Sequence, residues 1–469
     1  MKDNFEQFDD KLINSLIERF ESMLDNDQHY FYDVDDFEEI IDFYLQNKDL
    51  KRVKTAIKLA INQHPQSLNF TLKQALYYSL AEHYDKAFDT LAKAEKLDPT
   101  NSEIFITRGS IYSQMSKSEK AIEEYIKAIE NAEDPEEIYK NIAFEYENIG
   151  NFNQSLEYLL KVIEIEPKND SIYYEISFCY EITKRIDEGI RFFNKNIDKY
   201  PYNKHIWFNL GILFYNLELF EKAIDAYDYS IAIDADFTTA YYNKAQCYFE
   251  LGKYHEAIEV YEETIQIENR DSFTFHHIGE CYERLEEYAK AIENYQHALE
   301  MDELFADAWI GLGICNDELG NMLAAEKCIK RALEIDPNNS EYWFVLGDIQ
   351  HKQNKFDESL KSYAKVSDLN PYSSDIWLDY SDVYFELSDP EQAIKVIKDG
   401  IKHQPDNADL YYRIAIYLVK FGKMQEGIVN LQIGLELDFN KHHQLFDYYP
   451  QCKNETKIVD IIELYRNNK

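Results

Sequence analysis

Apolar residues recur along the chain in pairs of stripes, each spaced like one face of an α-helix. Between residues 204 and 237, the first stripe comprises two aromatic rings, a leucine and a glycine: Trp207, Leu210, Gly211 and Phe214. The second stripe begins with Ala223 and Tyr227. Residues three, four and seven positions apart share one side of a helix. The pattern therefore predicts two amphipathic helices that pack against each other as a hairpin.

The same pair of stripes recurs with a period of 34 residues, which divides residues 34–441 into twelve units without an insertion or deletion. A fixed period of this length indicates stacked repeats rather than separate domains. Counted from the first residue of each unit, position 4 is aromatic in eleven of the twelve and holds all four tryptophans, and position 8 is small in eleven. We expect the small residue to let the two helices approach while the ring fills the remaining space.

Residues that interrupt helices stand at two fixed places in the unit. Gly, Asp, Asn or Ser occurs near positions 15 and 16, where we expect the chain to turn between the two helices. A proline that would end the second helix stands at position 32 in seven units: Pro65, Pro99, Pro167, Pro201, Pro337, Pro371 and Pro405.

This pattern resembles the tetratricopeptide repeat. The signature residues of that family are matched at Trp207, Leu210, Gly211, Phe214, Ala223 and Tyr227. The resemblance covers residues 34–441 and extends to repeat-only chains of bacterial type. It implies an all-α, right-handed α-solenoid superhelix of about twelve helix-turn-helix repeats, with the first helices lining a concave groove.

Repeats cannot bury their own end faces, so we expect a capping helix at each end. Residues 1–33 contain an apolar stripe at helical spacing: Leu12, Leu16, Ile17, Phe20 and Leu24. A helix that folds into the groove or docks on a partner is the alternative for this segment. Residues 442–469 continue the pattern as a partial repeat or cap through Ile458, Ile461 and Tyr465.

The charge of the chain excludes several kinds of partner. Asp and Glu number 88 against 49 Lys and Arg, which leaves a formal net charge of -39 among 469 residues. Such a chain repels nucleic acid phosphates and anionic lipid headgroups. No basic start followed by an apolar run and no membrane-length apolar stretch is present, so we expect a cytoplasmic protein without membrane insertion. The oligomeric state stays open.

Motifs of catalysis are absent from the sequence, which predicts a protein that is not an enzyme and needs no cofactor. There is no phosphate-binding glycine loop, nucleophile elbow or zinc-protease helix. Cys247, Cys281 and Cys315 are 34 residues apart, so they fall on parallel helices about 8 to 10 Å apart, too far for a disulfide. We expect them to be small core residues.

His276, His277 and Glu280 form the group that most resembles a metal site. His276 and Glu280 lie one helical turn apart, but two ligands on one helix do not make a site. A further ligand from a neighbouring unit could be Gln246 or Asp307. The sequence predicts no metal, while a metal-binding or small-ligand protein with its site at this group remains the alternative.

Positions 2, 5, 6, 9, 12 and 13 of each first helix face away from the hairpin and should line the groove. In the middle units they are aromatic, apolar or amide-bearing: Asn141, Phe144, Tyr174, Phe178, Phe208, Asn209, Ile212, Tyr215, Tyr242, Asn243, Gln246 and Phe249. Towards both ends of the array they are acidic: Asp35, Glu38, Glu39 and Asp42, then Asp375, Asp379 and Asp382.

These groove residues favour a non-enzymatic scaffold that binds a protein or peptide segment, basic or amphipathic, in the middle of the array. Asn141, Asn209 and Asn243 share position 6, where the stretch resembles tetratricopeptide arrays that hold peptide backbones with asparagine ladders. The alternative is that these side chains pack against neighbouring helices. A self-associating structural solenoid is also open.

Overall fold

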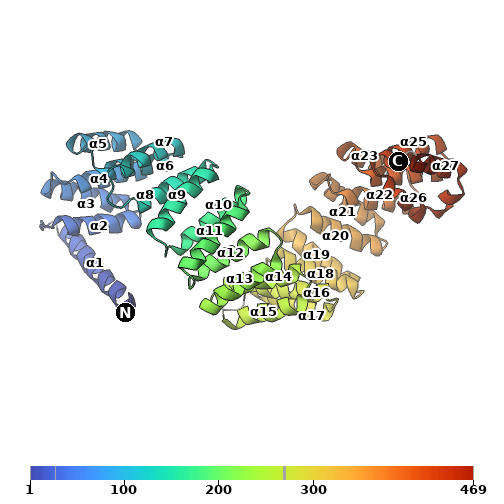
Figure 1. Ribbon diagram of the computed structural model, residues 1–469, viewed down its shortest axis with the longest axis horizontal. Helices are drawn as coiled ribbons and strands as arrows, with labels where there is room; N and C mark the ends of the chain where they lie inside the picture. The colour runs from blue at the N-terminus through green and yellow to red at the C-terminus, as the bar shows by residue number, and fades with distance from the viewer. Residues whose placement is uncertain (1, 27, 268–270, 468–469) are drawn as a thin grey trace. The chain divides into compact units, whose positions relative to one another are not determined.

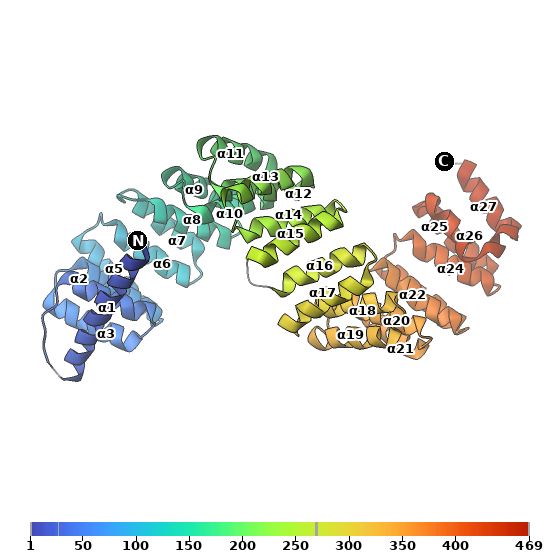
Figure 2. The same cartoon turned by 90° about the horizontal axis from the view of Figure 1, so that it is seen from below.

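The computed structural model describes the backbone of residues 2–26, 28–267 and 271–467, and the side chains of residues 13–26, 28–267, 271–373 and 375–466. The described residues form helices and contain no strand, which confirms the all-α class. Within each of two parts of the chain, the helices follow one another as hairpins stacked in chain order (Figures 1 and 2). In this part of the chain no helix is both long and apolar enough to cross a membrane.

The chain divides into two compact units, Met1–Ile233 and Asp234–Lys469. The first unit contains α1 (Lys2–Asp25), α2 (Val34–Gln46), α3 (Leu50–Gln63), α4 (Leu68–Leu80), α5 (Tyr84–Leu97), α6 (Ser102–Gln114), α7 (Ser118–Ile129), α8 (Glu136–Asn148), α9 (Phe152–Ile165), α10 (Asp170–Ile182), α11 (Ile186–Lys199), α12 (Lys204–Asn216) and α13 (Phe220–Ile233).

The second unit contains further helical hairpins and a differently folded end. Its helices are α14 (Thr238–Glu250), α15 (Tyr254–Ile267), α16 (Ser272–Arg284), α17 (Tyr288–Met301), α18 (Ala306–Glu318), α19 (Met322–Ile335), α20 (Ser340–Lys352), α21 (Phe356–Leu369), α22 (Ser374–Glu386), α23 (Pro390–His403), α24 (Ala408–Lys420), α25 (Met424–Leu437), η1 (Phe439–His442), α26 (His443–Tyr448), η2 (Pro450–Asn454) and α27 (Thr456–Asn467).

From α2 to α25, first helices occupy positions 1–13 of the repeat and second helices begin at position 17. Position 15 carries the turn. In every repeat its φ is positive, from 54° at Lys48 to 77° at Gly320 and Gly422. This left-handed conformation ends the first helix, and glycine adopts it without strain. The expected break between the two helices is therefore confirmed.

Where position 8 is glycine and position 24 is tyrosine, the glycine makes room for the ring of the same repeat. A Cβ atom added to Gly211 would lie 2.4 Å from the Tyr227 ring, and one added to Gly279 would lie 2.7 Å from the Tyr295 ring. These distances are far below a normal carbon–carbon contact, so the tyrosine ring packs directly on the glycine backbone. In these repeats the glycine of the first helix therefore allows a close contact between its own backbone and a tyrosine ring of the second helix, in addition to the expected approach of the two helix backbones.

The tryptophans at position 4 connect successive repeats. Each donates a hydrogen bond of 2.8 to 2.9 Å from Nε1 to the backbone carbonyl at position 32 of the preceding repeat: Trp207 to Pro201, Trp309 to Glu303, Trp343 to Pro337 and Trp377 to Pro371. The ring therefore fixes the end of the preceding helix in addition to filling space.

Helix α1 packs on the first hairpin through Ile17 and Phe20 of the predicted stripe and through Met23, which the stripe did not include. Ile17, Phe20 and Met23 are buried, and the Phe20 ring lies 5.8 Å from that of Tyr32 and 6.2 Å from that of Tyr44. The expected contribution of Leu12 falls outside the described side chains.

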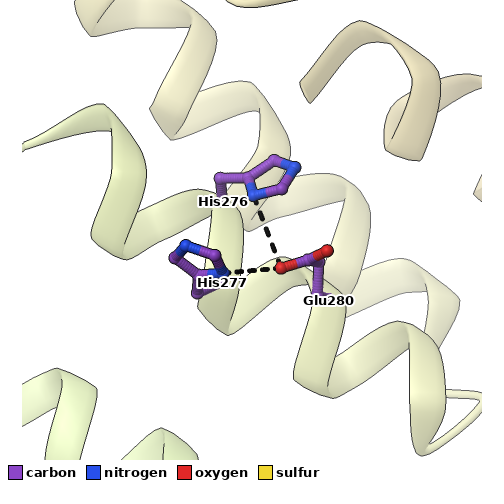
Figure 3. A group of neighbouring side chains, drawn as sticks. All are labelled: His276, His277 and Glu280. Carbon is purple, nitrogen blue, oxygen red and sulfur yellow. Dashed lines mark hydrogen bonds and ion pairs between the residues drawn. The ribbon is translucent and has the colours of Figure 1, made fainter. Parts of the chain in front are cut away.

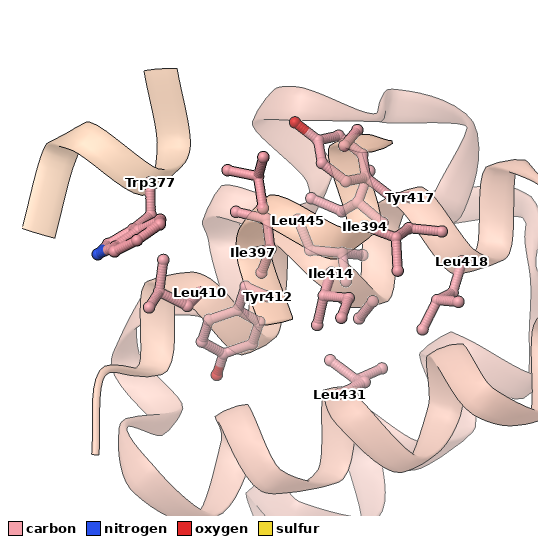
Figure 4. Close-up of a cluster of buried hydrophobic side chains, with 14 of the residues drawn as sticks. Trp377, Ile394, Ile397, Leu410, Tyr412, Ile414, Tyr417, Leu418, Leu431 and Leu445 are labelled. Atoms are coloured by element: carbon pink, nitrogen blue, oxygen red, sulfur yellow. The ribbon is translucent and has the colours of Figure 1, made fainter. Parts of the chain in front are cut away.

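The last residues depart from the repeat pattern. After α25 the chain forms two short 3-10 helices and α26 before α27 begins. Figure 4 shows Leu445 of α26 within the cluster formed by α23 and α24, beside Ile394, Ile414 and Tyr417. In α27 Ile458 is fully buried while Ile461 and Tyr465 are partly buried.

Candidate functional site

Two aromatic rings of the first unit lie open on the groove positions. Phe144 on α8 is 56% exposed and Phe178 on α10 is 46% exposed. Both occupy position 9, in adjacent repeats, so they project from the same side of two successive first helices. Exposed rings at this position contribute little to the packing of their own hairpins.

Phe208 and Asn209 do not lie open, and the expectation that they face a partner is wrong. Phe208 is 2% exposed and Asn209 is 0% exposed. The Phe208 ring packs at 5.6 Å from both Tyr174 of the preceding repeat and Tyr227 of its own. Phe208 thereby fills the contact between α10 and α12, as the packing alternative predicts.

The asparagine ladder is also not formed at Asn209. Its Nδ2 donates a 2.7 Å hydrogen bond to the backbone carbonyl of His205, one turn earlier in α12. The amide is therefore used within its own helix and is shielded from solvent. Asn141 and Asn243, the other two asparagines at position 6, are half-buried.

The remaining middle-groove residues are half-buried, and those with known partners contact side chains of their own repeat or of the next one. The rings at position 12 pack on the start of the second helix, Tyr215 on Phe220 and Phe249 on Tyr254, each at 5.4 Å. Gln246 accepts a hydrogen bond of 3.1 Å from Tyr261 and donates one of 3.0 Å to Glu250. The side chains of Tyr174, Ile212 and Tyr242 are also half-buried.

The open rings stand beside negative charge. Glu175 lies three residues before Phe178 on α10, and burial together with the nearby carboxylate of Glu147 raises its pKa. Lys140, the cation on the groove side of α8, is held by Glu136 at 2.5 Å and by Glu137 at 3.5 Å. The negative charge of ionised Glu175 is therefore not fully balanced by a nearby cation in the folded chain.

At the acidic start of the array, two of the four predicted carboxylates pair with the next repeat. Glu38 accepts a hydrogen bond of 2.6 Å from Asn69, and Asp42 forms an ion pair with Lys73. Asp35 and Glu39 are exposed. The charge of this zone is thus partly neutralised by its own repeats.

The three acidic residues predicted at the far end of the array, in the second unit, lie in different environments. Burial, followed by the neighbouring carboxylates of Asp348, Asp382 and Asp375, raises the pKa of Asp379 to about 6. Asp375 is exposed.

Asp382 is not open to a partner, contrary to expectation. It pairs with Arg413 and accepts hydrogen bonds of 2.5 Å from Tyr417 and from Tyr448. Tyr448 belongs to α26, which the repeat pattern does not predict.

A cavity of about 480 Å³ opens in the second unit on the groove positions of α16, α18 and α20. Its polar wall carries four carboxylates and one guanidinium: Glu280, Glu283, Asp307, Glu341 and Arg284. Gly311 is among the residues that line it, and the Tyr295 ring packs on the backbone of this glycine, because a Cβ there would lie 2.3 Å from the ring. Sequence reasoning missed this cavity.

His276, His277 and Glu280 meet at one edge of this cavity (Figure 3). Nδ1 of His277 donates to Oε2 of Glu280 at 2.6 Å, and Nδ1 of His276 lies 3.5 Å from the same oxygen. Burial lowers the pKa of His276. Burial alone would raise the pKa of Glu280, but the hydrogen bond from His277 and the charges of both imidazoles hold it below its usual range.

Comparison with protein families gives three matches. Two family models, each described as a tetratricopeptide repeat, match residues 102–135 with 136–169 and residues 350–425. The first two ranges begin where α6 and α8 begin. The chain carries tetratricopeptide repeats. Such repeats imply protein partners, and none of the matched families is catalytic.

The third family model is described as the C-terminal domain of cilia and flagella-associated protein 70, and it matches residues 231–364. This match does not support the expected bacterial type. No curated protein matches the chain.

Three solved structures are similar to the chain in fold. YrrB, described as having an unusual peptide-binding site, is 23% identical, with 38% of this chain and 93% of that one covered and a TM-score of 0.32. A chain of the APC/C hetero-tetramer Cut9-Hcn1 is 15% identical, with 88% and 95% covered and a TM-score of 0.42. A repeat protein from Parabacteroides merdae is 13% identical, with 53% and 98% covered and a TM-score of 0.42.

Proposed function

We propose that the chain is a non-enzymatic scaffold whose groove binds a basic, amphipathic segment of another protein. The observation that carries this proposal is the exposure of Phe144 and Phe178 at the same position of adjacent repeats. Full burial of a phenylalanine side chain contributes roughly 1.5–3 kcal/mol, and these two rings, each about half exposed, realise only part of that gain in the isolated chain. A partner with apolar side chains would supply the missing contact.

The negative charge around the two rings indicates that the partner is also basic. The raised pKa of Glu175 reflects an ionised carboxylate that burial and Glu147 disfavour. A lysine or arginine of a bound segment would compensate it. The raised pKa of Asp379 in the second unit and the net charge of -39 favour the same sign of partner.

Selection from a random peptide display library tests this partner chemistry with the full chain as bait. We expect the enriched peptides to combine lysine or arginine with large apolar residues. Selection against the double variant Phe144→Ala/Phe178→Ala should lose these peptides. The matched control is Tyr202→Ala, which removes an 86% exposed ring from the loop before α12. Enrichment of acidic peptides, or equal enrichment by the double variant, would refute the proposal.

The match of residues 231–364 to a ciliary protein's domain supports a more specific cellular site for this scaffold. We propose that the protein acts in the cilium or flagellum, which refines the expectation of a cytoplasmic protein. Imaging of the tagged chain in ciliated cells tests this location. Signal along the cilium is the expected result, and its exclusion from the cilium would contradict the proposal.

A further inference from the structure

The second unit contains a compact set of metal-binding side chains that protein recognition does not require. Among the described residues, His276, His277 and Glu280 are the one group of three whose ligand atoms all lie within 4.8 Å of one another. All three project from α16, at positions i, i+1 and i+4. Two imidazoles and one carboxylate are a ligand set that zinc commonly takes, with water completing the coordination.

The buried imidazole of His276 lacks a hydrogen bond at one of its ring nitrogens, Nδ1. Its side chain is 11% exposed, and Nδ1 makes a 3.5 Å contact with Oε2 of Glu280 but no hydrogen bond within the described structure. Buried polar atoms are normally satisfied, so an unpaired nitrogen aimed at a carboxylate indicates a missing ligand. The 3.5 Å separation from Oε2 of Glu280 is close to the edge of about 3.3 Å that tetrahedral zinc bonds of about 2.0–2.1 Å require.

The second imidazole is held in place by groups outside the ligand set. Nε2 of His277 contacts the hydroxyl of Tyr242, and its ring stacks on Tyr261 at 5.7 Å with an interplanar angle of 13°. A histidine that binds metal through one nitrogen commonly gives the other N–H to such a partner. In the metal-free chain Nδ1 of His277 donates to Glu280, whereas in the tautomer with the proton on Nε2, which then donates to Tyr242, Nδ1 would offer its lone pair to a metal.

The cavity beside the group favours a cation. Carboxylates of Glu283, Asp307 and Glu341 line it against the single guanidinium of Arg284. A volume of about 480 Å³ leaves room for the water that an open zinc position holds.

We propose that His276, His277 and Glu280 bind a divalent cation of the zinc class in the groove of the second unit. Binding would move the proton of His277 from Nδ1 to Nε2, beside the Tyr242 hydroxyl, and the cation would take the lone pairs of Nδ1 of His277 and Nδ1 of His276 together with Oε2 of Glu280. The site lies on groove positions, so the cation would also add a positive centre where a partner's carboxylate could reach.

Calorimetric titration of Zn²⁺ into the full-length chain, purified without a histidine tag, tests the proposal. We expect one cation per chain, a raised melting temperature and, with Co²⁺ as probe, the visible absorption of a four- or five-coordinate site. No heat and no change in melting temperature would overturn the site.

Variants identify the ligands. Glu280→Gln keeps the shape of the side chain and should weaken Zn²⁺ binding about tenfold or more, while His276→Ala should abolish it. The matched control is His297→Ala, which removes an exposed imidazole 3.2 Å from Glu300 on α17 and should leave binding unchanged. Undiminished binding by Glu280→Gln, with its melting temperature unchanged in the absence of metal, would overturn the assignment.

Discussion

At the scale of single residues, Phe144 and Phe208 show how two phenylalanines on groove positions serve different purposes. The Phe208 ring contacts Tyr174 and Tyr227 and is shielded from solvent, whereas more than half of the Phe144 side chain reaches solvent. The difference arises from position: position 5 faces the adjoining first helix, and position 9 faces outward. Phe208 therefore stabilises the repeat, and Phe144 remains available to a partner.

Alanine substitutions should separate these two roles. Phe208→Ala removes a buried ring and leaves a cavity, so the free energy of unfolding should fall by about 3–5 kcal/mol. Phe144→Ala should change it by no more than about 0.5 kcal/mol. Urea denaturation followed by circular dichroism measures both. Equal losses in the two variants would contradict this division.

The raised pKa of Asp379 predicts a pH-dependent effect of one substitution. Its folded pKa of about 6 lies above the ordinary value of 3.8, so the folded chain holds this proton more tightly than the unfolded chain. The resulting stabilisation is complete below about pH 4 and is lost as the pH rises through about 6. Asp379→Asn stays neutral throughout.

Asp379→Asn should therefore match the wild type near pH 4 and exceed its free energy of unfolding by up to about 3 kcal/mol at about pH 7.5. Urea denaturation at the two pH values gives the comparison. A difference that stays constant between them would show that burial and the neighbouring carboxylates do not raise the pKa of Asp379 in the folded chain.

At the scale of elements, the turn at position 15 sets the ends of both helices in a repeat. Gly150, Gly252, Gly320 and Gly422 adopt the left-handed conformation there, and side-chain-bearing residues such as Glu218 adopt it at φ of 59°. The left-handed conformation costs residues that have a Cβ roughly 1 kcal/mol of conformational free energy. Some hairpins are therefore closed by a strained residue.

Exchanging residues at this position should shift stability in opposite directions. Glu218→Gly should raise the free energy of unfolding by about 0.5–1 kcal/mol because glycine accepts the turn without strain. Gly150→Ala should lower it by about 1 kcal/mol, and by backbone strain alone, since no atom lies within 4 Å of the added Cβ. Melting temperatures of the two variants report the signs, and equal signs would refute the explanation.

The period of 34 residues predicts the helices well because each boundary depends on local chemistry: a turn at position 15 and, in seven repeats, a proline at position 32. The fate of a groove side chain depends instead on its neighbours. Phe208 is buried because Tyr174 stands one repeat earlier, and Asp382 is covered because Tyr448 reaches it from a helix outside the repeat pattern. The spacing of apolar residues along one helix does not predict contacts of this kind, which involve residues of other helices.

At the scale of the whole molecule, charge governs encounter with a partner. A chain with a net charge of -39 attracts basic segments over distances comparable to the Debye length, about 10 Å at 0.1 M salt. Raising the salt concentration should therefore slow association with a basic peptide about tenfold or more while changing dissociation less. Stopped-flow fluorescence separates the two rates, and an association rate independent of salt would contradict this role of charge.

The central claim is that exposed groove rings of the first unit hold the partner. Fluorescence anisotropy with a display-selected basic peptide tests it most directly, comparing wild type, Phe144→Ala/Phe178→Ala and the control Tyr202→Ala. We predict a Kd weakened about tenfold or more in the double variant, with an unchanged melting temperature, and an unchanged Kd in the control. Equal affinity of the double variant and the wild type would contradict the account.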